Sequence, residues 1–242
     1  MTTTTPDRPV AVSVLGPPAS GKSTLTAALA SRHPSSTFRL REYARHRAAQ
    51  DAALADAVRA SKDPLGWLSD SVAGNLVNDA VRGPFRPAPG VLLLLEGYPG
   101  NPVQAAHLAD LAASVGAALL VLDLQVDQET AWQRARTRRV CPVCGPGSGA
   151  EPHRPAEVGP DGECARCGGR LQQRRDDTAG SLAARTGRFH HHYPRIRSRL
   201  QERGVPWHTI DTRCPPAAVV AAADAVLGNH PYLSFDPGAL IP

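Results

Sequence analysis

The chain has 242 residues and a mass of 25.6 kDa, and its 27 lysine and arginine residues against 22 acidic ones give a net charge of +5. This length permits one α/β domain or two small ones, with a core that needs no disulfide support. The longest apolar runs, such as residues 217–223, fall far below the roughly 18 residues of a membrane-spanning helix, which excludes a transmembrane protein. Residues 1–9 lack the pattern of a secretory signal, so we expect a cytoplasmic protein with reduced thiols and no membrane partner.

Positive charge is concentrated in one part of the chain. The sequence has two lysines, Lys22 and Lys62, whereas residues 134–203 contain 15 arginines and 7 acidic residues. Such a concentration favours a multiply charged anion, either a nucleoside triphosphate or a nucleic-acid backbone.

Strand-like and helix-like patterns alternate along the chain. Five segments have the short apolar pattern of strands, namely residues 10–15, 38–42, 91–96, 117–124 and 206–210. Helical patterns occupy the residues between them, namely 22–32, 44–60, 67–82, 101–114, 127–139, 177–203 and 217–227. Asn101 before Pro102 and Asp127 are typical helix starts, and we expect an interruption near Tyr193 and Pro194. The alternation predicts an α/β fold, a doubly wound parallel sheet of five strands with helices on both faces.

The first strand and helix are joined by a phosphate-binding motif. Residues 16–23 read GPPASGKS and fit the pattern G-x4-G-K-[ST] in the strand–loop–helix context that the motif requires. Backbone N–H groups of such a loop surround phosphate oxygens, Lys22 reaches the β- and γ-phosphates, and Ser23 holds Mg²⁺. We therefore predict that MgATP is bound by this P-loop, through Gly16, Pro17, Ala19, Ser20, Gly21, Lys22, Ser23 and Thr24.

A second motif lies in a segment with almost no aliphatic residues. Cys141, Cys144, Cys164 and Cys167 have the spacing C-x2-C-x19-C-x2-C, which is typical of a structural four-cysteine zinc site. Zinc would stabilise this segment, which has too little apolar surface to fold alone. The fifth cysteine, Cys214, is interpreted as an ordinary buried thiol.

Together with these two motifs, three further segments resemble the adenylate kinases, specifically the nucleoside monophosphate kinases with a zinc-bearing lid. They are EGYPGNPVQA at 96–105, RARTRRVCPVCG at 134–145, and LQQRRDD at 171–177, which Arg185 follows eight residues later. The resemblance covers residues 10–227. It implies a P-loop kinase core at 1–139 and 174–242, a helical acceptor-binding region at 38–82, and a zinc lid at 140–173 that closes over ATP.

The resemblance also implies roles for the arginines of these segments. Arg134 would contact the adenine or the lid hinge, and Arg138, Arg174 and Arg185 would converge on the phosphoryl group in transfer. Such arginines stabilise the charge that spreads over the equatorial oxygens in the transition state. Asp176 and Asp177 would orient the arginines and help the lid to close.

The acceptor side departs from the family pattern. Gly100 replaces the arginine that holds the AMP phosphate, and the segment S-T-G-D-x-L-R reads REYARHR at residues 41–47, where Arg47 keeps the last position. Gln104 is also kept. We therefore expect a small-molecule acceptor, a nucleoside or nucleotide other than plain AMP. We also expect a protein that acts as a monomer.

Two alternatives remain open. In the first, the acceptor is a hydroxyl, Glu42 is its general base, Glu96 either competes for that role or orders the Mg²⁺ shell, and Tyr43 and Trp67 stack on the acceptor. In the second, the chain is a nucleic-acid-binding P-loop ATPase with a zinc ribbon, although aromatic residues form only 5% of it and none lies in the cysteine segment. The three histidines at 190–192 fit a partly exposed helix better than a metal site.

Overall fold

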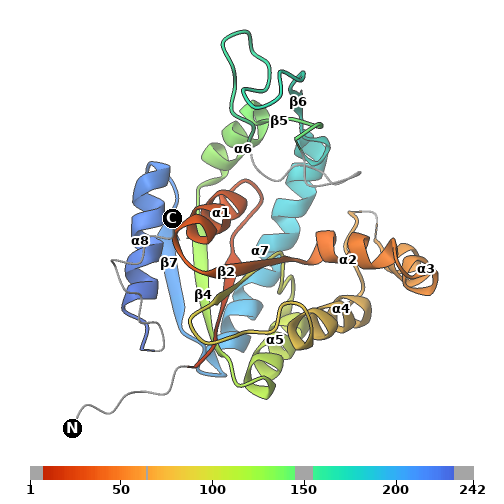
Figure 1. Ribbon diagram of the computed structural model, residues 1–242, viewed down its shortest axis with the longest axis vertical. Helices are drawn as coiled ribbons and strands as arrows, with labels where there is room; N and C mark the ends of the chain where they lie inside the picture. The colour runs from red at the N-terminus through yellow and green to blue at the C-terminus, as the bar shows by residue number, and fades with distance from the viewer. Residues whose placement is uncertain (1–7, 64, 145–154, 232–242) are drawn as a thin grey trace.

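A computed structural model of the protein describes residues 8–63, 65–144 and 155–231 (Figure 1). Its centre is a five-stranded sheet in which every pairing is parallel. Across the sheet the strands are ordered β2 (Ser35–Arg39), β3 (Leu92–Glu96), β1 (Val10–Leu15), β4 (Ala118–Gln125) and β7 (Trp207–Asp211). The central strand β1 is buried along its whole length, as expected for a parallel strand covered on both faces. The predicted α/β fold with a parallel sheet is therefore confirmed.

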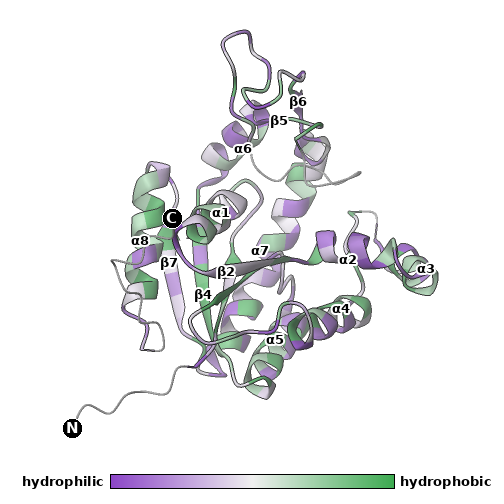
Figure 2. Cartoon of the chain, in the orientation of Figure 1, coloured by the Kyte–Doolittle hydropathy of each residue, from purple (hydrophilic) through white to green (hydrophobic). Residues whose placement is uncertain are grey.

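Helices cover both faces of the sheet, and each face has its own hydrophobic core. Helices α1 (Lys22–Arg32) and α8 (Pro216–Gly228) pack with alternate side chains of the strands, such as Val12 and Leu120. Helices α4 (Asp70–Arg82), α5 (Pro102–Ser114) and α7 (Ala179–Gln201) pack on the opposite face with Leu93, Leu95 and Val121. In Figure 2, β4 and α8 are largely green, whereas α7 is more polar along its length. The result is a three-layer doubly wound domain.

Two smaller parts extend from this core (Figure 1). Helices α2 (Leu40–Ala48) and α3 (Ala52–Ser61) project beside α4 at one side of the sheet. At the other end, α6 (Gln128–Thr137) leads to the cysteine segment, whose base is the antiparallel pair β5 (Arg139–Val140) and β6 (Gln172–Gln173). A 3-10 turn, η1 (Arg175–Asp177), then joins this segment to α7.

The predicted helix starts rest on side-chain caps. The Asn101 carboxamide oxygen accepts a hydrogen bond from the Gln104 N–H at 3.0 Å, with Pro102 in the first turn. The Asp127 carboxylate likewise accepts from the Thr130 N–H at 2.8 Å. Each bond satisfies one of the N–H groups that a helix start leaves without an internal partner, which is why these residue types mark helix starts so reliably.

Three predicted elements differ from the structure. The single helix expected over 44–60 is two helices, α2 and α3, because the chain turns at residues 49–51 and Asp51 caps the second helix. The second strand is Ser35–Arg39 rather than 38–42, because residues from Leu40 onward already form α2. Helix α7 also continues through the exposed Pro194 without interruption, although a proline inside a helix removes one backbone hydrogen bond. Among the described helices, none has both the length and the apolar character needed to cross a bilayer.

Candidate active site

A cleft of about 480 Å³ opens at the carboxyl ends of β1 and β3, the usual ligand position in a doubly wound sheet. Five parts of the chain line it, namely the P-loop, the α2 region with Lys62 and residues 65–68, the loop that follows β3, Arg138 at the end of α6, and the segment from Arg174 into α7. The predicted donor side and the predicted acceptor region therefore face one common space.

The P-loop has the backbone shape that its sequence predicts. Gly16 and Gly21 have positive φ angles of 146° and 94°, and a Cβ atom at Gly16 would lie 2.8 Å from the Leu124 carbonyl oxygen. The Lys22 ammonium donates to the carbonyl oxygens of Gly16 at 2.8 Å and Pro17 at 2.7 Å. Burial lowers the pKa of Lys22 to about 8, although the nearby Glu96 carboxylate opposes that shift. The lysine is thus held inside the loop.

Glu96 gathers three donors at the end of β3. Its carboxylate accepts hydrogen bonds from the Ser23 hydroxyl, from Thr26 Oγ1 at 3.2 Å and from Arg39 Nε at 2.9 Å. Burial alone would raise the pKa of Glu96, but Arg39 and the Ser23 hydroxyl outweigh it, so the pKa lies below its ordinary value. An ionised carboxylate beside the Ser23 hydroxyl is a suitable group for ordering water around Mg²⁺.

Arg39 is a site residue that the sequence reasoning missed. It pairs in register with Glu96 across the β2–β3 ladder, and its guanidinium also lies 3.8 Å from the Glu42 carboxylate. The positions of the two residues could have indicated this contact, because an arginine at the end of one parallel strand lies beside a glutamate at the end of the next. Recognising it required the correct end of β2, which the sequence reasoning placed three residues too late.

The three predicted phosphoryl-transfer arginines, Arg138, Arg174 and Arg185, all line the cleft close enough to Lys22 to lower its pKa. Two acidic residues hold these arginines in place. The buried Asp177 forms a bidentate pair with Arg138, with distances of 2.6 and 2.8 Å.

Asp176 serves several arginines at once. Its carboxylate lies 3.1 Å from Arg174, 3.8 Å from Arg185 and 3.2 Å from Arg41 of α2. Burial, followed by repulsion from Arg174 and Arg41, lowers the pKa of Arg185 to about 10. The structure thus concentrates several guanidinium groups and one buried ammonium where a polyphosphate would lie.

Arg134 does not line the cleft and lies near the end of β7. Its guanidinium donates to the Thr212 carbonyl oxygen at 2.5 Å and lies 3.4 Å from the Thr212 hydroxyl. The side chain therefore connects α6 with the loop that follows β7. That position is compatible with the predicted contact to the base or to the lid hinge.

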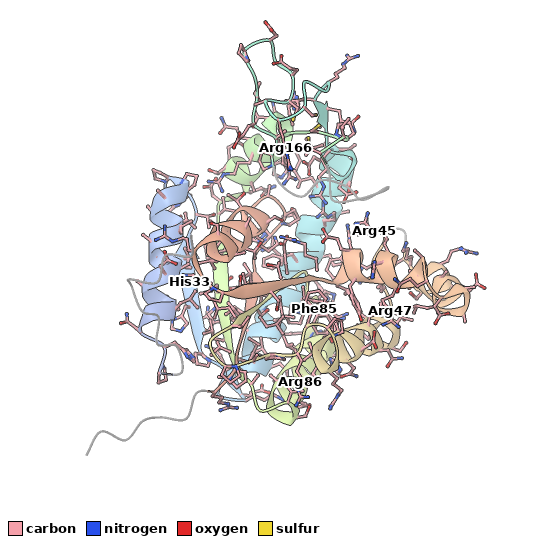
Figure 3. All side chains as sticks on the ribbon, viewed as in Figure 1. His33, Arg45, Arg47, Phe85, Arg86 and Arg166 are labelled. Carbon is pink, nitrogen blue, oxygen red and sulfur yellow. The ribbon has the colours of Figure 1, made fainter. Side chains whose placement is uncertain are left out.

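Two predicted acceptor residues point away from the cleft, which corrects the expectation that they bind the acceptor. The Tyr43 ring is buried against Phe38 and Phe85, with centroid distances of 5.5 and 5.8 Å. Its hydroxyl and the Arg47 guanidinium both bind the Asp79 carboxylate, at 2.5 and 2.6 Å. Figure 3 shows Arg47 on the side of α2 that faces α4, opposite Arg45.

The other predicted acceptor residues, Glu42 and Gln104, do line the cleft, as does Trp67. Burial raises the pKa of Glu42, and the neighbouring Arg39 partly offsets this. The Gln104 carboxamide oxygen accepts from the Gly100 N–H at 2.7 Å, and its amide donates to Asp70 at 2.8 Å. The acceptor half of the cleft thus has one carboxylate, one hydrogen-bonded amide and one indole, together with the cations Arg41, Arg45 and Lys62.

The four clustered cysteines fit a tetrahedral zinc site. Their sulfur atoms all lie within 4.8 Å of one another, with Cys141 and Cys167 at 3.5 Å and Cys144 and Cys164 at 3.9 Å. Zinc–sulfur bonds of about 2.3 Å place the corners of a tetrahedron about 3.8 Å apart, close to these separations. Residues 145–154 of the predicted lid lie outside the described residues. Cys214 is exposed, so the expectation of a buried thiol there is wrong.

Relatives among known proteins cover most of the chain. An adenylate kinase from Symbiobacterium thermophilum is 31% identical over 193 residues, which are 79% of this chain and 87% of that protein. The chain belongs to the adenylate kinase family. Adenylate kinases from Salinispora tropica and Anaeromyxobacter sp. strain Fw109-5 are 32% and 28% identical, over 71% and 89% of this chain and 77% and 98% of their own lengths. No protein-family model matches the chain.

Membership of the adenylate kinase family makes the protein an ATP-dependent kinase, a transferase that binds ATP and a nucleotide-type acceptor. Kinases of this family use Mg²⁺ with ATP. The four-cysteine cluster is compatible with zinc binding. The predicted family, fold class and enzyme class are therefore confirmed.

Proposed function

We propose that the protein transfers the γ-phosphoryl group of MgATP to a nucleoside or nucleotide other than plain AMP. The proposal rests on two positions at which the family pattern places cations that bind the acceptor phosphate. In this chain neither position offers such a cation to the cleft. Position 100 is a glycine covered by the Trp67 ring, and Arg47 is bound to Asp79 outside the cleft. We therefore infer that the acceptor is not held through cations at those two positions.

On the donor side, the P-loop backbone and Lys22 would hold the triphosphate of ATP. Ser23 and Glu96 would hold Mg²⁺ with its water shell, and the metal would neutralise charge on the β- and γ-phosphates. Arg134 would border the adenine. The segment 140–173, stabilised by zinc on its four thiolates, would close over the nucleotide and exclude water.

Transfer itself requires positive charge around the equatorial oxygens of the moving phosphoryl group. Arg138, Arg174 and Arg185 would supply it, and their carboxylate partners already hold them in the cleft before substrates bind. One chain provides the donor loop, the arginines and the acceptor wall, so we further propose that the protein acts as a monomer.

The test is a panel of nucleosides, nucleoside monophosphates and sugar alcohols, assayed by ADP release and by detection of the phosphorylated product. We expect at least one nucleoside or nucleotide to exceed AMP at least tenfold in kcat/KM. If AMP were the best acceptor in the panel, the proposal would be wrong.

A hydroxyl acceptor with Glu42 as general base is the second candidate. It is favoured because Glu42 borders the cleft with a raised pKa, whereas the carboxylate of Glu96 already accepts three hydrogen bonds. A hydroxyl arrives protonated and gains from a positioned base.

This candidate predicts that Glu42→Gln lowers kcat with a hydroxyl acceptor by about 10² to 10⁴, the usual worth of a general base. The KM for ATP should not change. Glu129→Gln, an exposed substitution on α6, is the matched control and should behave as wild type. Unchanged turnover in Glu42→Gln would remove Glu42 as the base.

A further inference from the structure

We propose that Arg41 is a further substrate-binding residue, which holds the phosphate of the acceptor where α2 meets the phosphoryl-transfer arginines. This inference rests on the proposed function and narrows its acceptor class to nucleotides. The position of Arg41 on α2, its contact with Asp176 and the charge of the surrounding cluster support it.

Arg41 lies in the first turn of α2, on the helix face that borders the cleft. Arg41 and Arg45 are four residues apart, so one turn of helix places them on the same face, and both line the cleft. The Arg45 Nε donates to the Arg41 carbonyl oxygen at 3.2 Å, which directs the Arg45 side chain toward the start of the helix. Arg47 lies on the opposite side of α2 and binds Asp79 (Figure 3). Helix α2 therefore offers the cleft two arginines other than the one that the family pattern predicts.

The Arg41 guanidinium joins this helix of the acceptor region to the donor-side arginines. Its Nη1 lies 3.2 Å from Oδ2 of Asp176, and the same oxygen lies 3.1 Å from Arg174 and 3.8 Å from Arg185. The side chain of Arg41 is nevertheless 45% exposed, so a phosphate can reach its guanidinium, which is a group that binds phosphate in bidentate geometry. A cation of the acceptor region thus lies where the transferred phosphoryl group must meet its acceptor.

The charges of this cluster favour an additional anion. Four arginines and two carboxylates form it, namely Arg41, Arg138, Arg174, Arg185, Asp176 and Asp177. The cluster therefore has two more positive than negative charges. A phosphate monoester brings a charge of about −1.5 to −2 at pH 7, whereas a hydroxyl acceptor brings none. Because the acceptor phosphate and the transferred phosphoryl group repel each other, a cation between α2 and the donor-side arginines is needed only when the acceptor is itself an anion.

The experiment combines substitution of Arg41 with removal of the acceptor phosphate. Binding of a nucleoside monophosphate and of its nucleoside is measured by titration calorimetry, with the donor site saturated by a non-hydrolysable MgATP analogue. The monophosphate is the one with the highest kcat/KM in the acceptor panel. Arg41→Gln should weaken monophosphate binding about tenfold to a hundredfold, the range for loss of a charged hydrogen-bonding partner. The affinity for the nucleoside should not change, which would also show that the variant is folded.

Arg59→Gln is the matched control, because it removes the same charge from the exposed surface of α3, where 77% of the Arg59 side chain is accessible. It should bind both ligands as wild type does. The KM for MgATP should not change in Arg41→Gln. A rise in that KM that matched the loss of monophosphate binding would mean that Arg41 only positions Asp176 and its arginines, and would overturn the inference. Equal losses for monophosphate and nucleoside, or an unchanged affinity for the monophosphate, would also overturn it.

The design separates this inference from the proposed function. If a nucleoside were the best acceptor in the panel, the proposed function would stand and this inference would fail. If AMP were the best acceptor, the proposed function would fail, and the same comparison, made with AMP and adenosine, would decide the role of Arg41.

Discussion

Lys22 provides the sharpest quantitative prediction, since its burial places its pKa near 8 rather than at the ordinary 10.5. In the free enzyme about nine in ten Lys22 side chains are charged at pH 7, but only about one in eleven at pH 9. The neutral amine cannot neutralise phosphate charge. We therefore expect kcat/KM for MgATP to be level near pH 7 and to fall about tenfold per pH unit well above pH 8, because this parameter reports free-enzyme ionisations.

The assay is a pH profile of kcat/KM for MgATP from pH 6.5 to 9.5 at saturating acceptor, in wild type and two variants. Lys22→Arg keeps its charge over this range, so its activity should be lower but its profile flat at high pH. Lys62→Arg replaces the other lysine of the chain and should retain the fall. A wild-type profile that stayed level to pH 9.5 would refute the claim that a buried, perturbed Lys22 holds the triphosphate.

Two further predictions concern the zinc site and Tyr43. Protein prepared without chelator should contain about one equivalent of zinc by mass spectrometry. The variant Cys164→Ser should lose this zinc, whereas the control Cys214→Ser, outside the cluster, should keep it. Full zinc retention in Cys164→Ser would contradict the site. Tyr43→Phe removes the bond to Asp79 and should lower the free energy of unfolding by about 1 kcal/mol in urea denaturation. The KM for the acceptor should not change, and a large rise in it would restore Tyr43 to the site.

The layout of the fold could be predicted because its signals are local. A buried parallel strand such as β1 is a continuous apolar run, and the Asn101 and Asp127 caps act within three residues of themselves. The β2 boundary was missed because an edge strand exposes much of its surface, so Ser35, Ser36 and Thr37 are acceptable there and do not resemble a core strand. Only its hydrogen bonds to β3 define it.

The donor half of the site could be predicted for the same reason, whereas the acceptor half could be predicted only in part, since Glu42 and Gln104 line the cleft but Tyr43 and Arg47 do not. The P-loop is one contiguous segment, and the arginines lie in quoted motifs. Tyr43 and Arg47, by contrast, are drawn from the cleft by Asp79, which is more than 30 residues further along the chain. The Trp67–Gly100 fit likewise joins two loops, and neither residue signals the other in the sequence.

Helix α7 has a consequence for how variants of this enzyme will behave. Arg185 and Arg188 are less than one turn apart on one continuous helix, the first beside the phosphoryl-transfer cluster and the second beneath the Trp67 indole. Because the helix is continuous, a tilt of its axis moves both side chains. Substitutions that shift the axis of α7 should therefore alter the KM values of both substrates together. Changes confined to the surrounding loops can alter the KM of one substrate alone.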